Sequence, residues 1–394
     1  MTPLNYTINN DGLTIRLDGR VDTSNVKQIE AEIKDLVSHY PDEAIILDCE
    51  NLELISSAGL RMVLRLKQSR DDTRLVNVSP TVFDVLQATG FTELMDIQRA
   101  YRVMSVKGCE VIGQGANGVV YRYDEDTIVK TFLNPDSLPE IQRERELART
   151  AFVLGIPTAI SYDVVRLEEG GFGAVYELLD AKSYIKVLVA GERTLDELVD
   201  MSIKLLKLIH SRQVKPETVP DMRAIALGWV EDVRALVTPG EYARLRQLVE
   251  DVPQDVHMLH GDYHFKNIML QNNESLLIDM DTLCYGHPIF ELAAMVNAYK
   301  GFLETDPEES MRFLGIPAQT AGEIWQKSLR RYLNEADEAT VRAVEQKALL
   351  IGHTRIMRRV YRRKQMDKPN GRAVYDNSRR RISELLQVVD TLTF

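Results

Sequence analysis

The spacing of apolar residues changes abruptly near Val106, and this change limits the fold more than any other feature of the sequence. Before Val106, short apolar runs alternate with stretches in which apolar residues recur at helical spacing, which predicts strands alternating with helices. After Val106, three strand-like runs follow one another with only Gly- or Asp-containing turns between them, as in an antiparallel sheet. From Ala181 onward the pattern is mainly helical. For a chain of 394 residues, these patterns predict two compact domains.

The segment before Val106 is expected to form a sheet covered by helices, because its pattern alternates between strand and helix. The expected strands cover residues 13–17, 44–47 and 74–78; of the expected helices, one includes Val26, one runs through Leu60 and one opens at Pro80. The first two strands are expected to be parallel, since a helix connects them. Thr23 or Ser24 is the candidate N-cap of the first helix.

A glycine-rich segment follows the first strand after Val106. Residues 113–119 read Gly-Gln-Gly-Ala-Asn-Gly-Val, and Gly113, Gly115 and Gly118 would let backbone amides approach phosphate oxygens without an intervening Cβ. A dinucleotide-binding fingerprint would run into a helix, whereas strand-forming residues follow directly here. The context therefore favours the phosphate-binding loop of a kinase. A plain hairpin turn is the alternative for this motif taken alone.

Lys130 and Glu144 are the candidates for an ion pair behind this loop. Lys130 lies in the middle of an apolar strand expected over residues 127–132, where a kinase lysine contacts the α- and β-phosphates. Glu144 shares the apolar face of a helix expected over residues 139–155, and a carboxylate on a buried face requires a cation. We therefore expect Glu144, rather than the outward-facing Glu146, to pair with Lys130. An exposed lysine on an edge strand is the alternative.

The segment from His260 to Asp279 carries the strongest chemical signal. It places Asp262 five residues before Asn267, as in the HxDxxxxN catalytic loop of kinases. Two apolar runs after Asn267 predict a hairpin whose open end brings Asn267 and Asp279 side by side. Amide and carboxylate oxygens are suitable ligands for Mg²⁺. We therefore expect Asn267 and Asp279 to hold Mg²⁺, while Asp262 orients and deprotonates an attacking hydroxyl.

Two other metal assignments are open in this segment. His257, His260 and His264 would share one face of a helix and form a metal cluster, but Gly261 and the flanking strand-like runs disfavour a helix there. Asp281 is either a further metal ligand or a solvated residue of a turn.

Composition and charge limit the compartment and the partners. The three cysteines, Cys49, Cys109 and Cys284, lie far apart without a CxxC pair, which indicates a reducing compartment. Neither a signal-peptide pattern nor an apolar run long enough to span a bilayer is present, so we expect a cytoplasmic protein with no membrane partner. A net charge of -11 disfavours nucleic acid.

The region of residues 355–381 is basic, in contrast to the rest of the chain. It is interpreted either as a solvated helix face or as part of the acceptor groove. In the groove it would repel a polycationic acceptor and favour an acidic or phosphorylated one.

These motifs together resemble the aminoglycoside phosphotransferase and choline kinase group of small-molecule kinases, over residues 106–394. The resemblance implies an α+β protein-kinase-like fold, with an antiparallel β N-lobe at residues 106–180 and a mainly helical C-lobe with the substrate site at residues 181–394. It also implies ATP and Mg²⁺ as cofactors.

The same resemblance assigns roles to single residues. It implies that Asp262, Lys130 and Glu144 are catalytic and that the backbone of Glu177 and Leu179 forms the adenine hinge. The motif His-Gly-Asp replaces the His-Arg-Asp of protein kinases and no APE segment follows it, which favours a small hydroxyl-bearing acceptor over a protein. Glu291 stands where the family pattern has an aspartate.

Residues 1–105 resemble the STAS domain of anti-sigma factor antagonists, a small α/β regulatory fold. The resemblance rests on residues 17–22 and 55–60, and it aligns Ser57 with the regulatory phosphoserine, whereas Ser56 stands where antagonists often carry Asp. A phosphate at the start of a helix would interact with the helix dipole and alter partner docking. The alternative is that Ser57 only caps the helix. The implied partner is an anti-sigma factor or another regulatory protein.

Two functions are therefore expected. The first is an ATP-dependent O-phosphotransferase that acts on a small molecule and is regulated through its STAS domain. The alternative is a partner-switching regulator of the anti-sigma factor antagonist type, with Ser57 as its phosphosite and a secondary or inactive kinase-like domain. The complete set of Lys130, Asp262, Asn267 and Asp279 favours the first. Because both domains share one chain, a third hypothesis is that the kinase-like domain phosphorylates Ser57.

Overall fold

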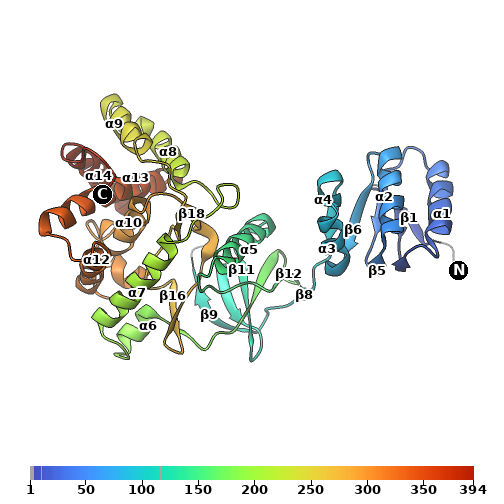
Figure 1. Cartoon of the computed structure of the whole chain (residues 1–394), viewed down its shortest axis with the longest axis horizontal. Coiled ribbons are helices and arrows are strands. Elements are labelled where there is room, and N and C mark those ends of the chain that lie inside the picture. The colour runs from blue at the N-terminus through green and yellow to red at the C-terminus, as the bar shows by residue number, and fades with distance from the viewer. Residues whose placement is uncertain (1–3, 10, 116–117) are drawn as a thin grey trace. The chain divides into compact units, whose positions relative to one another are not determined.

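The computed structural model describes residues 4–9, 11–115 and 118–394, and the chain divides into two compact units (Figure 1). The first unit comprises residues 1–105 with residues 164–170, and the second comprises residues 106–163 and 171–394. Each unit has its own hydrophobic core. The change in the spacing of apolar residues at Val106 coincides with the start of the second unit.

The first unit has the α/β architecture that its alternating pattern predicts. Its main sheet has the order β1-β2-β4-β6-β7, with β1 antiparallel to β2 and the other pairs parallel. A second, smaller sheet joins β3 and β5 in parallel. The strands are β1 (Tyr6–Asn9), β2 (Gly12–Arg16), β3 (Gly19–Val21), β4 (Ile45–Asp48), β5 (Leu52–Ile55), β6 (Arg74–Val78) and β7 (Ile97–Arg99), and the helices are α1 (Val26–His39), α2 (Ser57–Ser69), α3 (Pro80–Ala88) and α4 (Phe91–Leu94). Buried side chains from β2, β4 and β6 form the centre of the core, for example Leu13, Leu47 and Leu75.

The N-cap predicted for α1 is wrong. The helix begins after Asn25, whose side chain accepts a hydrogen bond from the N–H of Asp22 at 3.0 Å. Ser24 instead donates its hydroxyl to Asp22 at 2.5 Å. A short polar side chain that bonds inside such a turn is not available to cap the helix, which is why neither Thr23 nor Ser24 has that role.

The second unit opens with the predicted antiparallel strands. Within this unit the strand order is β13-β11-β10-β9, and all three pairs are antiparallel. These strands are β9 (Glu110–Gln114), β10 (Gly118–Arg122), β11 (Thr127–Phe132) and β13 (Phe172–Glu177), and α5 (Leu138–Val153) follows β11 in the chain. The parallel pair of β8 (Val103–Met104) and β12 (Asp163–Leu167) belongs to the first unit, except for Asp163.

The rest of the second unit is mainly helical (Figure 1). Its helices are α6 (Tyr184–Val189), α7 (Leu195–His210), α8 (Met222–Asp232), α9 (Pro239–Glu250), α10 (Ile289–Val296), α11 (Glu309–Phe313), α12 (Ala318–Tyr332), α13 (Glu338–Arg362) and α14 (Pro369–Leu385). Four short strands interrupt them: β15 (Met258–Leu259), which pairs with β18 (Cys284–Tyr285), and β16 (Ile268–Gln271), which pairs with β17 (Glu274–Leu277). A further short strand, β14 (Lys182–Ser183), pairs with β16 and completes a three-stranded sheet with the order β14-β16-β17.

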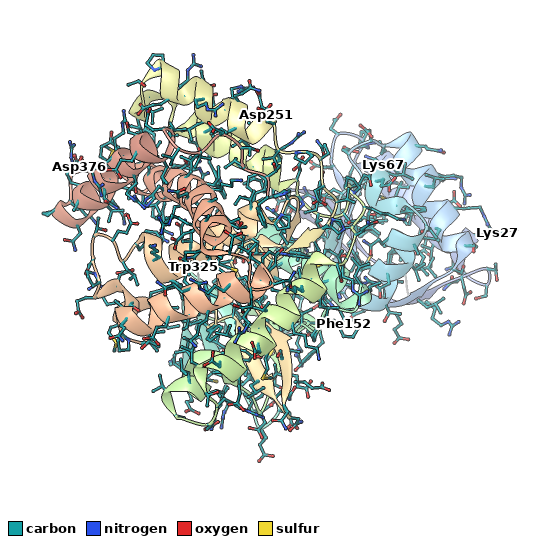
Figure 2. The ribbon with its side chains drawn as sticks, turned by 60° about the vertical axis from the view of Figure 1, so that its left-hand side comes forward. Lys27, Lys67, Phe152, Asp251, Trp325 and Asp376 are labelled. Carbon is teal, nitrogen blue, oxygen red and sulfur yellow. The ribbon has the colours of Figure 1, made fainter. Side chains whose placement is uncertain are left out.

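The helical part is held by a large core that includes Trp325 of α12 (Figure 2). The Trp325 ring is buried, and its Nε1 donates to Glu345 of α13 at 2.7 Å. α13 packs against both α10 and α14, so its position is fixed from two sides. None of the helices in the described residues is long and apolar enough to cross a membrane.

Candidate active site

The loop between β15 and β16 holds the candidate catalytic residue Asp262. Gly261 precedes it with φ +84°, and a Cβ there would collide with the carbonyl oxygen of Thr282, so the position requires glycine. The N–H groups of His260 and Gly261 donate to the carboxylate of Glu291 at 2.5 and 3.0 Å. These two bonds fix the loop to the first turn of α10, and so determine where Asp262 lies.

Glu291 is longer than the aspartate of the family pattern and still reaches both amides. Its side chain is completely buried, and His210 Nε2 lies 3.7 Å from Glu291 Oε2. On its other side, His210 Nδ1 lies 2.8 Å from the hydroxyl of Tyr332. Burial alone would raise the pKa of Glu291, but the nearby His210 imidazole and the hydrogen bond from the N–H of His260 outweigh it and lower the pKa. The carboxylate is therefore ionised beneath the loop.

The hairpin predicted after Asn267 is present. Its two central turn residues, Asn272 and Asn273, have φ values of 49° and 66°, which asparagine tolerates and which a two-residue hairpin turn requires. At the open end, the N–H of Ile278 donates to the carbonyl of Asn267 at 3.0 Å. Asn267 and Asp279 therefore lie at the ends of two adjacent strands.

The donor atoms at this open end fit a hard divalent cation. Asn267 Nδ2 donates to the main-chain carbonyl of Asp262 at 3.0 Å, which leaves Asn267 Oδ1 available to a cation. Asp279 has a left-handed backbone (φ 58°, ψ 67°), a strained conformation that is often kept at functional sites. Asp281 keeps exposed surface, yet desolvation and then the charges of Glu144 and Asp279 raise its pKa to about 6. Such a concentration of negative charge favours a cation, and Mg²⁺ often takes one or two protein oxygens together with phosphate oxygens.

Lys130 links the two lobes of the second unit. Its Nζ lies 2.9 Å from Glu144 Oε1 and 2.6 Å from Asp279 Oδ1. Glu144 is buried on α5, while Glu146 belongs to the same helix and has no part in the pair. Desolvation alone would lower the pKa of Lys130, but the charges of Asp279 and Glu144 outweigh it and raise the pKa. The lysine thus stays charged at the place where the strand, the helix and the hairpin end meet.

The side chain of Asp262 is half-exposed and lies near His264 and Arg355. His264 Nε2 lies 3.4 Å from Asp262 Oδ2. Burial alone would raise the pKa of Asp262, but the hydrogen bond from His264 and the positive charge of Arg355 hold it well below its usual range. The carboxylate is therefore ionised and retains an oxygen that is open to an acceptor molecule.

The glycine loop lies between β9 and β10, although Ala116 and Asn117 fall outside the described residues. A Cβ at Gly118 would collide with the carbonyl oxygen of Thr131 on the neighbouring strand, so this glycine permits close contact of two strands. Gly115 donates its N–H to the carbonyl of Gly118 at 3.0 Å, which closes the loop at its base. Gly113 belongs to β9.

The expected adenine hinge lies at the end of β13. Glu177 is the last residue of that strand, and Leu179 follows two residues later. Between them, Leu178 donates its N–H to the carbonyl of Asp126 at 2.7 Å. This bond ties the segment to the start of β11.

The three histidines considered as a metal cluster do not share a helix. His257 to Leu259 are extended, and His260 and His264 lie in the loop that follows. Each contacts a different group: His257 bonds Asp255 at 2.5 Å, His260 lies 3.2 Å from the carbonyl of Ile278, and His264 contacts Asp262. Within the described ranges, no group of three or more His, Cys, Asp or Glu side chains is arranged to hold a metal.

In the first unit, Ser57 is exposed and is the first residue of α2. The cap of this helix is Ser56, whose hydroxyl oxygen accepts from the N–H groups of Ala58 and Gly59 at 3.2 and 3.4 Å. The alternative that Ser57 only caps the helix is therefore wrong, because the preceding serine already has that role.

Some contacts of the site were not expected from the sequence. The hydroxyl of Tyr176 donates to Glu144 Oε1 at 3.4 Å. Tyr176 pairs with Ile128 across the sheet, and the two-residue period of a strand puts it on the same face as Lys130, so alternation could have indicated this contact. The contact of His210 with Glu291 had no local signal, because the two residues lie far apart in the sequence.

Comparison with known proteins identifies both parts of the chain. Residues 108–323, more than half of the chain, match the phosphotransferase enzyme family, and residues 3–103 match the STAS domain. The putative anti-sigma factor antagonist BtrV of Bordetella bronchiseptica is 35% identical over 92 residues, which cover 22% of this chain and 78% of that protein.

Two solved structures show the likeness of the second part. A thermostable mutant of aminoglycoside phosphotransferase APH(4)-Ia in a ternary complex with AMP-PNP and hygromycin B has a TM-score of 0.50 at 12% identity, over 72% of this chain and 94% of that chain. The gentamicin complex of APH(2")-IIa has a TM-score of 0.45 at 16% identity, over 79% of this chain and 98% of that one. At 12% identity, the likeness to APH(4)-Ia concerns the fold alone. It confirms the predicted kinase-like architecture. The chain therefore belongs to the phosphotransferase enzyme family and carries a STAS domain ahead of its kinase-like domain.

Proposed function

We propose that this chain transfers the γ-phosphoryl group of ATP to a hydroxyl group of a small molecule. The observation that carries the proposal is the position of Lys130 Nζ, 2.9 Å from Glu144 and 2.6 Å from Asp279. A kinase needs its phosphate-binding lysine and its metal-binding carboxylate together in this way. The family match supports a phosphotransferase, and the fold likeness includes a protein solved with AMP-PNP.

In the proposed reaction, the acceptor hydroxyl oxygen attacks the γ-phosphorus. The new O–P bond forms as the bond from the γ-phosphorus to the β,γ-bridging oxygen breaks, and ADP leaves. The hydroxyl proton passes to a carboxylate oxygen of Asp262. A carboxylate with a low pKa stays ionised, so Asp262 would mainly orient the hydroxyl and accept its proton late. His264 contacts one oxygen of Asp262 and leaves the other for the acceptor.

The remaining proposed site residues bind the nucleotide. Lys130 would contact the α- and β-phosphates, with Glu144 holding its position, and the backbone of the three loop glycines would cover the phosphates. The backbone of Glu177 and Leu179 would bind the adenine. Asn267 and Asp279 would hold Mg²⁺, which supplies positive charge next to the transferring phosphoryl group when bound.

The test of this proposal is acceptor-dependent turnover by the full-length chain. ADP release would be followed with ATP and Mg²⁺ against a panel of amino sugars, amino alcohols and hydroxy acids. We expect ADP release to rise with at least one acceptor and the phosphorylated product to appear by mass spectrometry. A folded chain that binds no nucleotide and releases no ADP with any acceptor would contradict the proposal.

We also propose that the STAS domain binds a regulatory protein and that phosphorylation of Ser57 controls this binding. The exposure of Ser57, together with the capping role of Ser56, leaves the Ser57 hydroxyl available for modification. The similarity to a putative anti-sigma factor antagonist supports an anti-sigma factor as the partner class. Incubation of the chain with ATP and Mg²⁺, followed by mass spectrometry, tests whether the kinase-like domain phosphorylates Ser57 itself. If Ser57 stays unmodified, its phosphorylation would have to come from another kinase.

Alanine substitutions at the two serines should have different effects on stability. Ser56→Ala removes the N-cap of α2 and is expected to lower the free energy of unfolding of the first unit by about 1 kcal/mol. Ser57→Ala should change it by less than about 0.5 kcal/mol, because an exposed side chain without a capping role contributes little. Chemical denaturation of both variants measures the difference, and equal losses would show that Ser57 has a structural role after all.

The three cysteines support a reducing compartment. All three are unpaired, and Cys49 and Cys284 are buried. Burial raises the pKa of Cys49 to about 12, so this residue remains a neutral thiol within the core. We therefore include the cytoplasm in the proposal.

A further inference from the structure

The last turns of α13 contain four arginines, of which two pair with a carboxylate of the described residues and two do not. Arg358 and Arg362 donate to Asp232 of α8 at 2.6 and 2.9 Å, so the two arginines share one carboxylate. Arg355 and Arg359 are also one turn apart and lie next to the first pair on the helix surface. Across the described parts of the chain, neither Arg355 nor Arg359 has a carboxylate within ion-pair distance, in contrast to the other two.

Arg355 lies beside the catalytic loop. Its Nη1 donates to the carbonyl of Gly261 at 3.2 Å, and its guanidinium lies 5.3 Å from the centre of the Trp229 ring. The bond to the Gly261 carbonyl uses one of the five N–H groups of Arg355, so the other four are left for a further acceptor. Its charge is also among the causes that lower the pKa of Asp262, after the opposing effect of burial and the hydrogen bond from His264. Arg355 is therefore close to the carboxylate that would receive the acceptor hydroxyl.

Two more cations lie near this loop: Arg359, on the same helix as Arg355, and Lys266, within the loop itself. Arg359 lies 5.3 Å from the centre of the Phe302 ring, and Lys266 of the catalytic loop lies 4.9 Å from the centre of the Phe313 ring. Desolvation and the charges of Arg363 and Arg355 lower the pKa of Arg359, while Asp262 opposes this effect.

The acidic residues of this region do not neutralise these cations. Glu309 lies 2.8 Å from Arg312, which also pairs with Asp306. The region between Asp262 and α13 thus contains two arginines that no carboxylate of the described residues pairs with. An arginine guanidinium can donate two parallel N–H bonds to one carboxylate or phosphate group. Arginines in such a region therefore favour a ligand that carries one of these groups.

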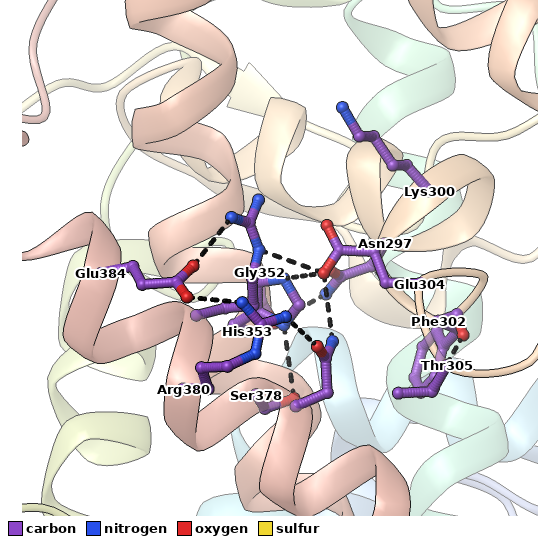
Figure 3. A network of polar contacts seen from close by, with 12 residues as sticks. Asn297, Lys300, Phe302, Glu304, Thr305, Gly352, His353, Ser378, Arg380 and Glu384 are labelled. Atoms are coloured by element: carbon purple, nitrogen blue, oxygen red, sulfur yellow. Dashed lines mark hydrogen bonds and ion pairs between the residues drawn. The ribbon is translucent and has the colours of Figure 1, made fainter.

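A buried polar network fixes the backbone that carries Arg355 and Phe302 (Figure 3). His353 lies between Glu304 and Ser378, at 3.3 Å from each. Asn297 Nδ2 donates to the carbonyl of Gly352 at 3.0 Å. Glu304 is two residues from Phe302 and His353 is two residues from Arg355, so the network holds the two segments together. Positioned side chains lose little freedom when they bind a ligand, which favours a binding site over a solvated surface.

We propose that Arg355, Arg359 and Lys266 bind an anionic group of the phosphoryl acceptor, and that this contact places the acceptor hydroxyl at Asp262. The inference rests on the proposed phosphotransferase function and assigns its acceptor to hydroxyl compounds that carry a carboxylate or a phosphate. The same charges would repel a polycationic acceptor.

The test uses four compounds that share one carbon skeleton: glycerate, glycerol 3-phosphate, glycerol and 3-amino-1,2-propanediol. Binding of each to the full-length chain, saturated with Mg²⁺ and AMP-PNP, is measured by calorimetry. We expect one of the two anions to bind at least about 10-fold more tightly than glycerol, and the amine to bind least. The two anionic arms distinguish a carboxylate from a phosphate as the recognised group.

Two charge-neutralising variants locate the contact. Arg359→Gln should weaken binding of the preferred anion about 10-fold and leave AMP-PNP binding unchanged. Arg362→Gln makes the same change at an arginine of α13 that pairs with Asp232, and it should alter anion binding by less than about 2-fold.

The inference fails if nucleotide binds but neither anion binds better than glycerol, or if Arg359→Gln weakens AMP-PNP binding instead, which would assign the cations to the nucleotide. Absence of AMP-PNP binding would contradict the proposed function itself.

Discussion

Asp262→Asn is expected to lower kcat about 10³-fold with little change in nucleotide affinity. The amide keeps the size of the side chain but cannot accept the hydroxyl proton. Asn267 is held by the main-chain carbonyl of Asp262 and not by its side chain, so the substitution leaves that contact in place. Steady-state kinetics with the acceptor found by panel screening, together with calorimetry of ATP binding, separate the two effects.

Asp251→Asn is the matched control, because Asp251 is an exposed carboxylate that follows α9 of the same unit (Figure 2). Its kcat should equal that of the unmodified chain. A kcat for Asp262→Asn within about 3-fold of the unmodified value would remove Asp262 from the proposed mechanism.

Glu291→Ala is expected to produce the largest loss of stability. The carboxylate accepts from the N–H groups of His260 and Gly261, and both amides would be left without this partner in a buried place. Each unsatisfied buried group costs on the order of 1–3 kcal/mol, so we expect the free energy of unfolding to fall by about 3 kcal/mol or more. The catalytic loop would also lose its anchor, so activity should fall even in the folded fraction. Denaturant unfolding followed by tryptophan fluorescence measures the loss.

Glu291→Gln separates the lost hydrogen bonds from the lost charge. Its carbonyl oxygen can still accept from one of the two amides, and its size fills the same space. We expect a stability between those of the unmodified chain and of Glu291→Ala. If Glu291→Ala unfolds at the same denaturant concentration as the unmodified chain, the carboxylate does not hold the loop.

Strands and helices with a strong apolar pattern could be predicted closely from the sequence. The bounds expected for β6 and β11 are those observed, because both runs are apolar and end at clear turns. β1 and β7 were not predicted. All four residues of β1 are exposed, and β7 has only three residues, so neither carries the alternation that marks a half-buried strand.

The site could be predicted where its contacts depend on short segments. The hairpin from Asn267 to Asp279 and the inward position of Glu144 follow from local periodicity alone. The division of the arginines of α13 could not be predicted in this way. Arg358 is neutralised by Asp232, which lies 126 residues earlier in the chain, so a basic run has the same sequence pattern whether it is paired or not. The sequence also could not show that Glu291 makes the hydrogen bonds expected of the family aspartate, because its partners, the N–H groups of His260 and Gly261, lie 31 and 30 residues earlier in the chain.

The most direct test of the account is calorimetry of ATP binding to the full-length chain with and without Mg²⁺. We predict ATP binding in Mg²⁺ that weakens at least about 10-fold in EDTA, because Asn267 and Asp279 would hold the nucleotide through the metal. Asn267→Ala should abolish most of this difference, while Asn370→Ala, at an exposed residue of α14, should retain it. Equal ATP affinity with and without Mg²⁺, or no ATP binding by the folded chain, would contradict the account.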